Sequence, residues 1–196
     1  IKMDETLKNL HKAFAGESQA RNRYAMYAKQ AKKEGFEQIA SIFEETADQE
    51  REHAKQLSKM INELTVKMGQ TQGPVIIEAE GAAMFGDTKT NLKGAIAGET
   101  YETSTMYPEF ATQAKNDGLE EIAKRLMAIG VAERHHAQRY QKLSDLVEAG
   151  KVFEKDDVIK NIFYVFKSLC IIFLSCTCFR ARQIYVNQSI IYLSLK

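Results

Sequence analysis

Residues 15–40 read AGESQARNRYAMYAKQAKKEGFEQIA, and residues 97–123 read AGETYETSTMYPEFATQAKNDGLEEIA. The two stretches are copies of one internal repeat, because both open with Ala-Gly-Glu and then follow the same pattern of apolar residues. Glu17 in the first copy matches Glu99 in the second at an offset of 82 residues, whereas the glycines near the ends of the copies match at an offset of 83. The second copy therefore contains one extra residue.

The extra residue lies between Glu99 and Gly118, inside a stretch with an otherwise helical pattern. A single inserted residue in a helix is commonly absorbed as a π-bulge, and such bulges often mark functional sites. Pro108 falls in the same interval and would also bend a helix. We therefore expect an irregular turn at this place.

Each copy of the repeat predicts a helix, a glycine-containing turn and a second helix. Apolar residues recur at steps of three and four along all four segments, as Leu7, Leu10 and Phe14 do at the start of the chain. Gly35 and Gly118 fall at the left-handed position that ends a helix, so each pair of helices should form an antiparallel hairpin. The expected helices cover about residues 5–33, 36–64, 88–116 and 119–148.

The segment that joins the two copies, residues 68–87, is long and rich in glycine. It can cross the whole bundle and return the third helix to the starting end. A four-helix bundle with one long crossover is the ferritin-like arrangement. We therefore predict an all-α, ferritin-like antiparallel four-helix bundle over residues 1–150, followed by a separate C-terminal tail over residues 151–196.

Composition and charge exclude some partners. The chain has 196 residues, of which 27% are charged, and its net charge is only +1. This balance gives no reason to expect nucleic acid as a partner. The sequence shows no apolar secretory segment near its start, and all three cysteines lie in the tail. A reducing, cytoplasmic location fits these features.

Ionisable side chains interrupt the apolar stripes of all four helices. Taken alone, a glutamate on such a stripe usually reaches solvent with its long side chain, and an inward histidine is usually a hydrogen-bonded core residue. Several ionised carboxylates in one apolar interior, however, would each cost on the order of several kcal/mol. No lysine or arginine recurs on these stripes at the same level, so we expect metal cations to neutralise the cluster. The candidate ligands are Glu17, Glu50, His53, Glu99, Glu102, Glu133 and His136.

Two Glu-x-x-His motifs, Glu50 with His53 and Glu133 with His136, make this metal site specific. Residues i and i+3 share one helix face with Cβ atoms roughly 5–6 Å apart, so a carboxylate and an imidazole can bind one metal there. One glutamate from each of two helices, plus Glu-x-x-His from each of the other two, is the di-iron carboxylate pattern. Zinc prefers fewer and softer ligands, so two ions of iron, or of manganese, suit this oxygen-rich set better.

The segments AFAGESQARNRYAMYAKQAKKEGFEQIASIFEETADQEREHAK and AIAGETYETSTMYPEFATQAKNDGLEEIAKRLMAIGVAERHH resemble the rubrerythrin family, over about residues 4–157. The resemblance implies that the seven candidate residues are the di-iron ligands, with Glu102 as an additional carboxylate one turn after Glu99. It also implies that Tyr24 and Tyr107 hydrogen-bond the ligand carboxylates or hydrogen peroxide, the substrate of the family. Core aromatic residues with a polar tip are the other explanation of these two tyrosines.

The resemblance also implies a function. In rubrerythrins the reduced di-iron site converts hydrogen peroxide to water, and an iron shifts between the positions of Glu102 and His53 with its redox state. The chain is then expected to be a non-haem di-iron peroxidase of oxidative-stress defence that forms homodimers or homotetramers. A ferritin-like ferroxidase or iron-binding protein is the alternative, and a non-catalytic structural or redox-sensing bundle is a third class. Glu102 favours the peroxidase.

The tail departs from the family, most of whose members end in a rubredoxin module with one iron on two Cys-x-x-Cys pairs. Residues 158–196 contain one Cys-x-Cys and no Cys-x-x-Cys, so we expect no rubredoxin-type Fe(Cys)4 site in this chain. The tail can be an out-of-frame product, a membrane anchor at residues 162–179, or a genuine extension. In each case the electrons would have to come from an external donor, such as a separate rubredoxin.

Overall fold

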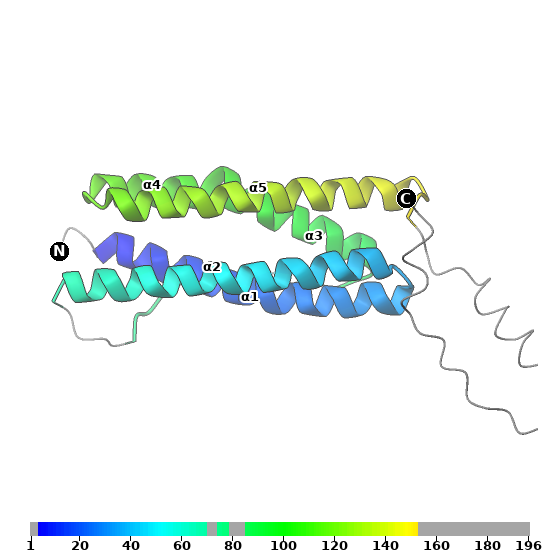
Figure 1. The fold of residues 1–196 in the computed structure, drawn as a ribbon, viewed down its shortest axis with the longest axis horizontal. Coiled ribbons are helices and arrows are strands. Elements are labelled where there is room, and N and C mark those ends of the chain that lie inside the picture. Colours follow the sequence, from blue (N-terminus) through cyan, green and yellow to red (C-terminus); the bar gives the residue numbers. More distant parts are fainter. Residues whose placement is uncertain (1–3, 70–73, 79–84, 153–196) are drawn as a thin grey trace, which may run out of the picture. The chain divides into compact units, whose positions relative to one another are not determined.

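The computed structural model describes residues 4–69, 74–78 and 85–152 of the chain. Its elements are α1 (Asp4–Glu34), α2 (Glu37–Lys67), α3 (Thr88–Tyr101), the π-helix η1 (Glu102–Met106), α4 (Tyr107–Asn116) and α5 (Glu120–Glu148). Because α3, η1 and α4 follow one another without a break, they form one long irregular helix of a four-helix bundle (Figure 1). The predicted all-α bundle is confirmed, and the predicted helix ends lie within three residues of those observed.

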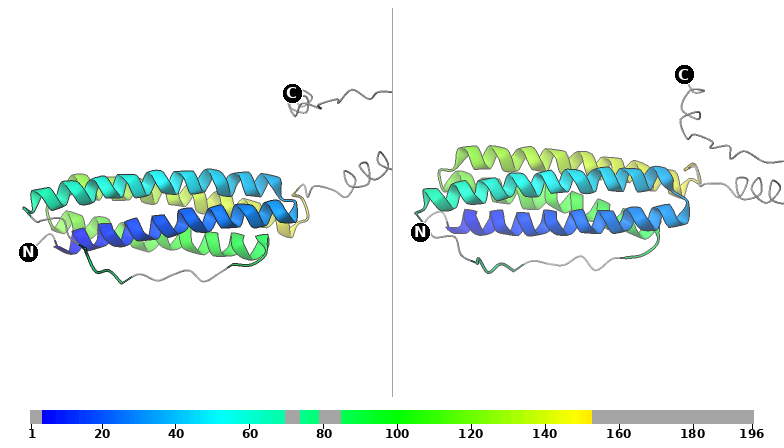
Figure 2. Two further views of the ribbon diagram at one scale, coloured as in Figure 1. Left: turned by 90° about the horizontal axis from the view of Figure 1, so that it is seen from below. Right: turned by 60° about the horizontal axis from the view of Figure 1, so that its bottom comes forward.

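The bundle consists of two antiparallel hairpins. In one, α1 packs against α2, and in the other the helix formed by α3, η1 and α4 packs against α5. α2 ends and α3 begins at opposite ends of the bundle, as Figure 1 and the turned views of Figure 2 show. The connection between them, described at residues 68–69, 74–78 and 85–87, therefore joins the two ends as predicted.

Both hairpin turns contain a glycine in the left-handed region, as the sequence predicted. Gly35 has a φ of 92° and Gly118 a φ of 75°. The amide of the residue after each glycine also donates back to the preceding helix. Leu119 N, for example, donates to Ala114 O at 2.8 Å. This return of two successive amides is the Schellman arrangement, which sets the direction in which the second helix leaves.

The extra residue of the second copy is absorbed by η1, so the predicted π-bulge is confirmed. The hydroxyl of Thr103 in this segment donates to the carbonyl oxygen of Gly130 on α5 at 2.7 Å. A Cβ on Gly130 would lie only 3.0 Å from Cβ of Tyr107, so the glycine lets the two helices approach closely here. The irregular turn is therefore fastened to α5.

The apolar core forms two clusters, one towards each end of the bundle. The first joins the start of α1 to the end of α2 and includes Leu10 and Leu57, whereas the second includes Tyr27 and Phe43 from the other end of the same hairpin. Between the two clusters lies a layer of buried side chains that carry charge or can carry it. The core therefore places a dry interior on both sides of this layer.

One predicted core position is wrong. Phe14 is 38% exposed, whereas its neighbour Ala13 is fully buried in the first cluster. Steps of three and four from Leu10 reach both positions, so periodicity does not choose between them. Ala13 lies four residues before the buried Glu17, so the two residues share one face of α1, and this face points into the bundle.

None of the described helices has the combination of length and apolar character that a membrane crossing requires. The predicted tail over residues 151–196 lies outside the described residues, apart from Lys151 and Val152. The three interpretations of the tail, as an out-of-frame product, a membrane anchor or a genuine extension, therefore concern residues outside the described part of the chain.

Replacing Gly118 with alanine should destabilise the bundle, because its φ of 75° strains any residue with a Cβ. Among the described residues, apart from its chain neighbours, nothing lies within 4 Å of the new methyl group. We expect the free energy of unfolding, measured by urea denaturation, to fall by about 1–2 kcal/mol. Gly16→Ala is the matched control: it lies inside α1, also with nothing within 4 Å, and should raise that free energy by roughly 0.5–1 kcal/mol. Changes of the same sign in both variants would contradict the argument.

Candidate metal centre

The layer between the two core clusters contains the candidate ligands predicted from the sequence. They come from α1, α2, α3 and α5, so each of the four bundle helices contributes. The four glutamates are 0% exposed, and the two imidazoles are 4% and 15% exposed. Such burial excludes the explanation in which each glutamate reaches solvent on its own. The six residues are Glu17, Glu50, Glu99, Glu133, His136 and His53.

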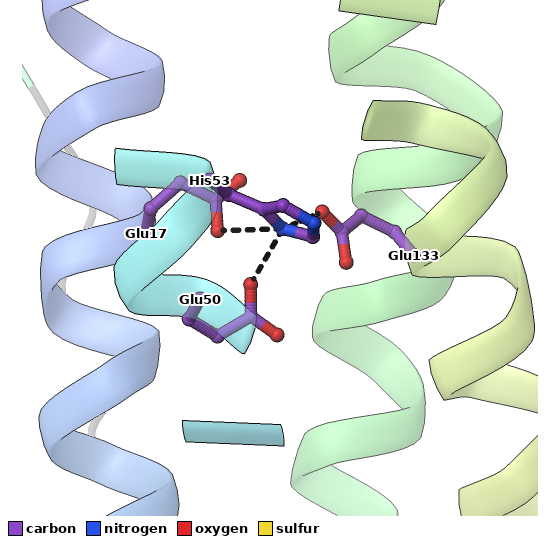
Figure 3. A group of neighbouring side chains, drawn as sticks. All are labelled: Glu17, Glu50, His53 and Glu133. Carbon is purple, nitrogen blue, oxygen red and sulfur yellow. Dashed lines mark hydrogen bonds and ion pairs between the residues drawn. The ribbon is translucent and has the colours of Figure 1, made fainter. Parts of the chain in front are cut away.

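One group of donors consists of Glu17, Glu50, His53 and Glu133 (Figure 3). The Nδ1 atom of His53 lies 2.7 Å from a carboxylate oxygen of Glu133, 3.1 Å from one of Glu50 and 3.7 Å from one of Glu17. One donor atom from each residue can be chosen so that all of them lie within 4.8 Å of one another. Because Glu133 belongs to α5 and the other three to α1 and α2, the group depends on the packing of the two hairpins.

A second group consists of Glu50, Glu99, Glu133 and His136. The Nδ1 atom of His136 lies 2.8 Å from an oxygen of Glu133, 3.1 Å from one of Glu50 and 3.3 Å from one of Glu99. The rings of His53 and His136 are stacked, with 5.9 Å between their centroids. Glu50 and Glu133 belong to both groups, so they are placed to bridge two adjacent metal positions, each completed by one further glutamate and one histidine.

The donors fit metal ions better than they fit hydrogen bonds. Oxygens of Glu17, Glu50, Glu99 and Glu133, and Nδ1 of His136, are buried without a hydrogen-bond partner among the residues that the structure describes. Such unpaired groups typically cost about 1–3 kcal/mol each, and more when they are charged. A cation within reach of all of them would remove this cost. Carboxylates with a minority of imidazoles are ligands that iron and manganese accept.

In the absence of a metal, protons neutralise the site. Burial and the neighbouring charges of Glu50 and Glu133 raise the pKa of Glu99 to about 8, and burial raises the pKa of Glu17 well above its usual value. Burial opposes the rise at His136, but the carboxylates around this imidazole raise its pKa to about 12. A metal ion would therefore displace protons from the site when it binds.

Each hairpin contributes a tyrosine that donates to a carboxylate of the other hairpin. Tyr24 on α1 donates its hydroxyl to Glu99 on α3, and Tyr107 on α4 donates its hydroxyl to Glu17 on α1. Both rings are fully buried, and burial raises the pKa of both phenols well above the usual value. They therefore stay protonated at neutral pH and orient the two carboxylates. Hydrogen bonds to ligand carboxylates are what the resemblance to rubrerythrins implied for these two tyrosines.

Glu102 belongs to neither donor group, although the sequence predicted it as a ligand. It is buried in η1, and burial together with the charge of Glu99 raises its pKa well above its usual value. The cation that acts on it is Arg23, whose guanidinium lies over the ring of Tyr24 with 5.5 Å between Cζ and the centroid. The side chain of Arg23 also reaches Gly98 of α3, where a Cβ would lie in ordinary contact with its Nη2 atom, at 3.7 Å.

Arg23 does not belong to the apolar stripe of α1, so the expectation that no lysine or arginine recurs on these stripes did not concern it, although its charge acts on Glu102. Periodicity did not reveal this residue, because its backbone lies beside the apolar stripe and only its long side chain reaches towards η1.

Sequence reasoning also missed Gln49, the residue before Glu50 on α2. Its amide oxygen lies 2.8 Å from Nε2 of His136, on the side of the ring away from the carboxylates. Gln49 and His53 also line an open hollow on the outer face of α2, together with four charged residues, which are Glu45, Asp48, Arg51 and Glu52. This hollow gives solvent a route to the more exposed of the two imidazoles.

The metal-free protein should lose stability as the pH rises from about 5 to about 8. The pKa of Glu99 is about 8 in the folded state against 4.5 for an ordinary glutamate, so over this range the unfolded chain releases a proton that the folded chain keeps. The raised pKa of His136 acts in the same direction above pH 6.5. The urea midpoint should therefore fall with pH for the metal-free protein and change less for the iron-loaded protein. A rising midpoint for the metal-free protein would contradict this account.

The comparisons with known proteins agree with this geometry. The family model described as rubrerythrin matches residues 8–144. The rubrerythrin of Nitratidesulfovibrio vulgaris is 45% identical over 160 residues, which are 82% of this chain and 80% of that protein. A solved structure of fully reduced, all-ferrous nigerythrin has a TM-score of 0.61 at 33% identity, and the match covers 74% of this chain and 68% of that one.

A bacterioferritin of Desulfovibrio desulfuricans has a TM-score of 0.62 at 19% identity, over 76% of this chain and 84% of its own. At this identity the likeness concerns the fold alone, and it confirms the predicted ferritin-like arrangement. Two iron ions fit the two donor groups, as in the di-iron carboxylate proteins. Because the matched residues include both hairpins and every candidate ligand, this chain belongs to the rubrerythrin family.

Proposed function

We propose that this chain is a non-haem di-iron peroxidase of rubrerythrin type, which reduces hydrogen peroxide to water with electrons from an external donor. The observation that carries the proposal is the pair of buried donor groups that share Glu50 and Glu133. The family match and the similarity to rubrerythrin and nigerythrin support redox chemistry at two irons. They favour this function over the ferroxidase alternative.

In the proposed ligand set, Glu50 and Glu133 are shared by the two donor groups, and one further glutamate with one histidine would complete each metal position. A seventh residue, Glu102, is the proposed exchangeable ligand, which replaces His53 when the redox state changes. The place of His53 inside a donor group and of Glu102 outside both groups supports a role of Glu102 in one redox state only. The proposed ligands are Glu17, Glu50, His53, Glu99, Glu102, Glu133 and His136.

Two ferrous ions would supply the two electrons that break the O–O bond, and two protons complete the two water molecules. The residues of the chain prepare the site for this reaction. Tyr24 and Tyr107 donate to the carboxylates of Glu99 and Glu17 and so hold these two proposed ligands in place. The apolar clusters on both sides limit water, which strengthens the electrostatic interactions inside the layer.

An external protein such as rubredoxin is the proposed electron donor, because the three cysteines of the sequence do not form the pattern of a rubredoxin iron site. We further propose that the chain works in the cytoplasm, in oxidative-stress defence, as a homodimer or homotetramer. The near-neutral net charge supports the absence of nucleic acid from its partners.

Iron loading separates the two enzymatic alternatives. Anaerobic addition of Fe²⁺ to the full chain should give two bound ions per chain, measured by metal analysis after desalting. In stopped-flow mixing, hydrogen peroxide should oxidise the loaded protein faster than dioxygen does. Faster oxidation by dioxygen, with deposition of many irons per chain, would support the ferroxidase instead.

Glu133→Gln should reduce both iron content and peroxide turnover, because it removes the charge of a carboxylate that belongs to both donor groups. We expect about one iron or less per chain and a rate of oxidation by peroxide that is lower by at least about tenfold. Glu52→Gln is the matched control, since Glu52 is an exposed glutamate of α2 that pairs with Lys55 at 3.1 Å. If the control lost as much iron as Glu133→Gln, the loss would not report on the proposed site.

A further inference from the structure

A chain of polar contacts leads from the surface of the bundle to the outer nitrogen of His136. Arg139 on α5 pairs with Glu45 on α2, with 3.0 Å between Nη1 and Oε2. The amide nitrogen of Gln49 donates to Oε1 of Glu45 at 3.3 Å. The amide oxygen of Gln49 lies 2.8 Å from Nε2 of His136. These contacts connect α5 to α2 and back to α5, next to the candidate metal centre.

The chemistry of these groups determines which nitrogen of His136 carries the proton. The ionised carboxylate of Glu45 can only accept, so it takes the amide N–H of Gln49 and leaves the amide oxygen for the imidazole. That oxygen can also only accept, so Nε2 of His136 must carry a hydrogen. In the neutral ring the lone pair then lies on Nδ1, the atom that faces Glu50, Glu99 and Glu133.

The internal repeat shows that the other histidine lacks this arrangement. His53 matches His136 at an offset of 83, and at the same offset Gln49 matches Ala132. A methyl side chain accepts no hydrogen bond, so the second copy supplies no counterpart of the Gln49 amide. His53 is also the more exposed ring, at 15% against 4%, and it lines the hollow on α2. The two metal positions therefore differ in how firmly their histidines are oriented.

We infer that Gln49 is a positioning residue, which holds His136 in the tautomer that binds metal through Nδ1 and makes the position beside His136 the tighter of the two. The inference rests on the ligand set of the proposed function. Partners of the non-coordinating nitrogen fix the orientation of a ligating histidine, and their loss typically lowers metal affinity about 10–100-fold. Gln49 acts through His136 and has no direct contact with the metal positions in this role.

Three variants of the full chain test the inference. Gln49→Leu removes the acceptor at similar size. Gln49→Glu combined with Glu45→Gln exchanges the amide and the carboxylate, so that an acceptor again faces Nε2 of His136. Gln56→Leu is the matched control, because Gln56 is an exposed glutamine two turns further along α2. All of them are compared with the wild-type chain after loading with Zn²⁺, which is diamagnetic and allows the histidine N–H signals to be observed by NMR.

The first readout is the exchange of the Nε2 proton of His136 with solvent in protein labelled with ¹⁵N-histidine. We expect this exchange to become at least about tenfold faster in Gln49→Leu, and to return towards the wild-type rate in the exchanged pair. The second readout is the affinity for each of two Zn²⁺ ions in a competition titration with a chelator. One ion should bind at least about tenfold more weakly in Gln49→Leu, whereas the other should keep its affinity.

The outcomes separate this inference from the proposed function. Unchanged proton exchange and unchanged affinities in Gln49→Leu would overturn the inference alone, and so would equal weakening of both ions. An exchanged pair that behaves like Gln49→Leu would also overturn it. If wild-type protein bound two ions but reduced no peroxide, the proposed function would be contradicted and the inference about Gln49 would stand, because neither readout depends on peroxide turnover. If wild-type protein bound no pair of ions, the proposed ligand set and the inference would fail together.

Discussion

Repulsion among buried carboxylates is the constraint on which the rest of the bundle depends. Five glutamates lie in one layer with little or no exposure, and the apolar clusters on both sides keep water from screening them. The layer can be neutral only if protons or metal ions supply positive charge. Two divalent ions do this while satisfying the carboxylate oxygens that have no hydrogen bond. Packing of the four helices and occupation of the site are therefore coupled.

The ligand side chains of the two donor groups are nearly related by two-fold symmetry, but the residues around the two groups differ. The repeat supplies the matching pairs of glutamates, histidines and tyrosines. Three departures from the repeat lie around these pairs: η1 with Glu102, Arg23, whose charge acts on Glu102, and Gln49 beside His136. The two candidate metal positions therefore have unequal surroundings, and the inequality arises from a few residues in an otherwise nearly symmetrical frame.

Periodicity and the repeat were enough to predict the four helices, both glycine turns, the π-bulge and the residues of the two donor groups. These features follow from backbone geometry and from the cost of buried charge, which are local or additive. Three features could not be predicted in this way. Whether Ala13 or Phe14 faces the core depends on a small rotation of α1 about its own axis. The contacts of Arg23 and Gln49 depend on the paths of long side chains between helices. The position of Glu102 outside both groups depends on the three-dimensional course of η1.

The crossed hydrogen bonds of Tyr24 and Tyr107 have a consequence for assembly. Each phenol orients a carboxylate that belongs to the opposite hairpin, so neither hairpin can arrange its own half of the site. Both carboxylates are therefore oriented only when the two hairpins have docked. Completion of the metal site depends in this way on completion of the fold.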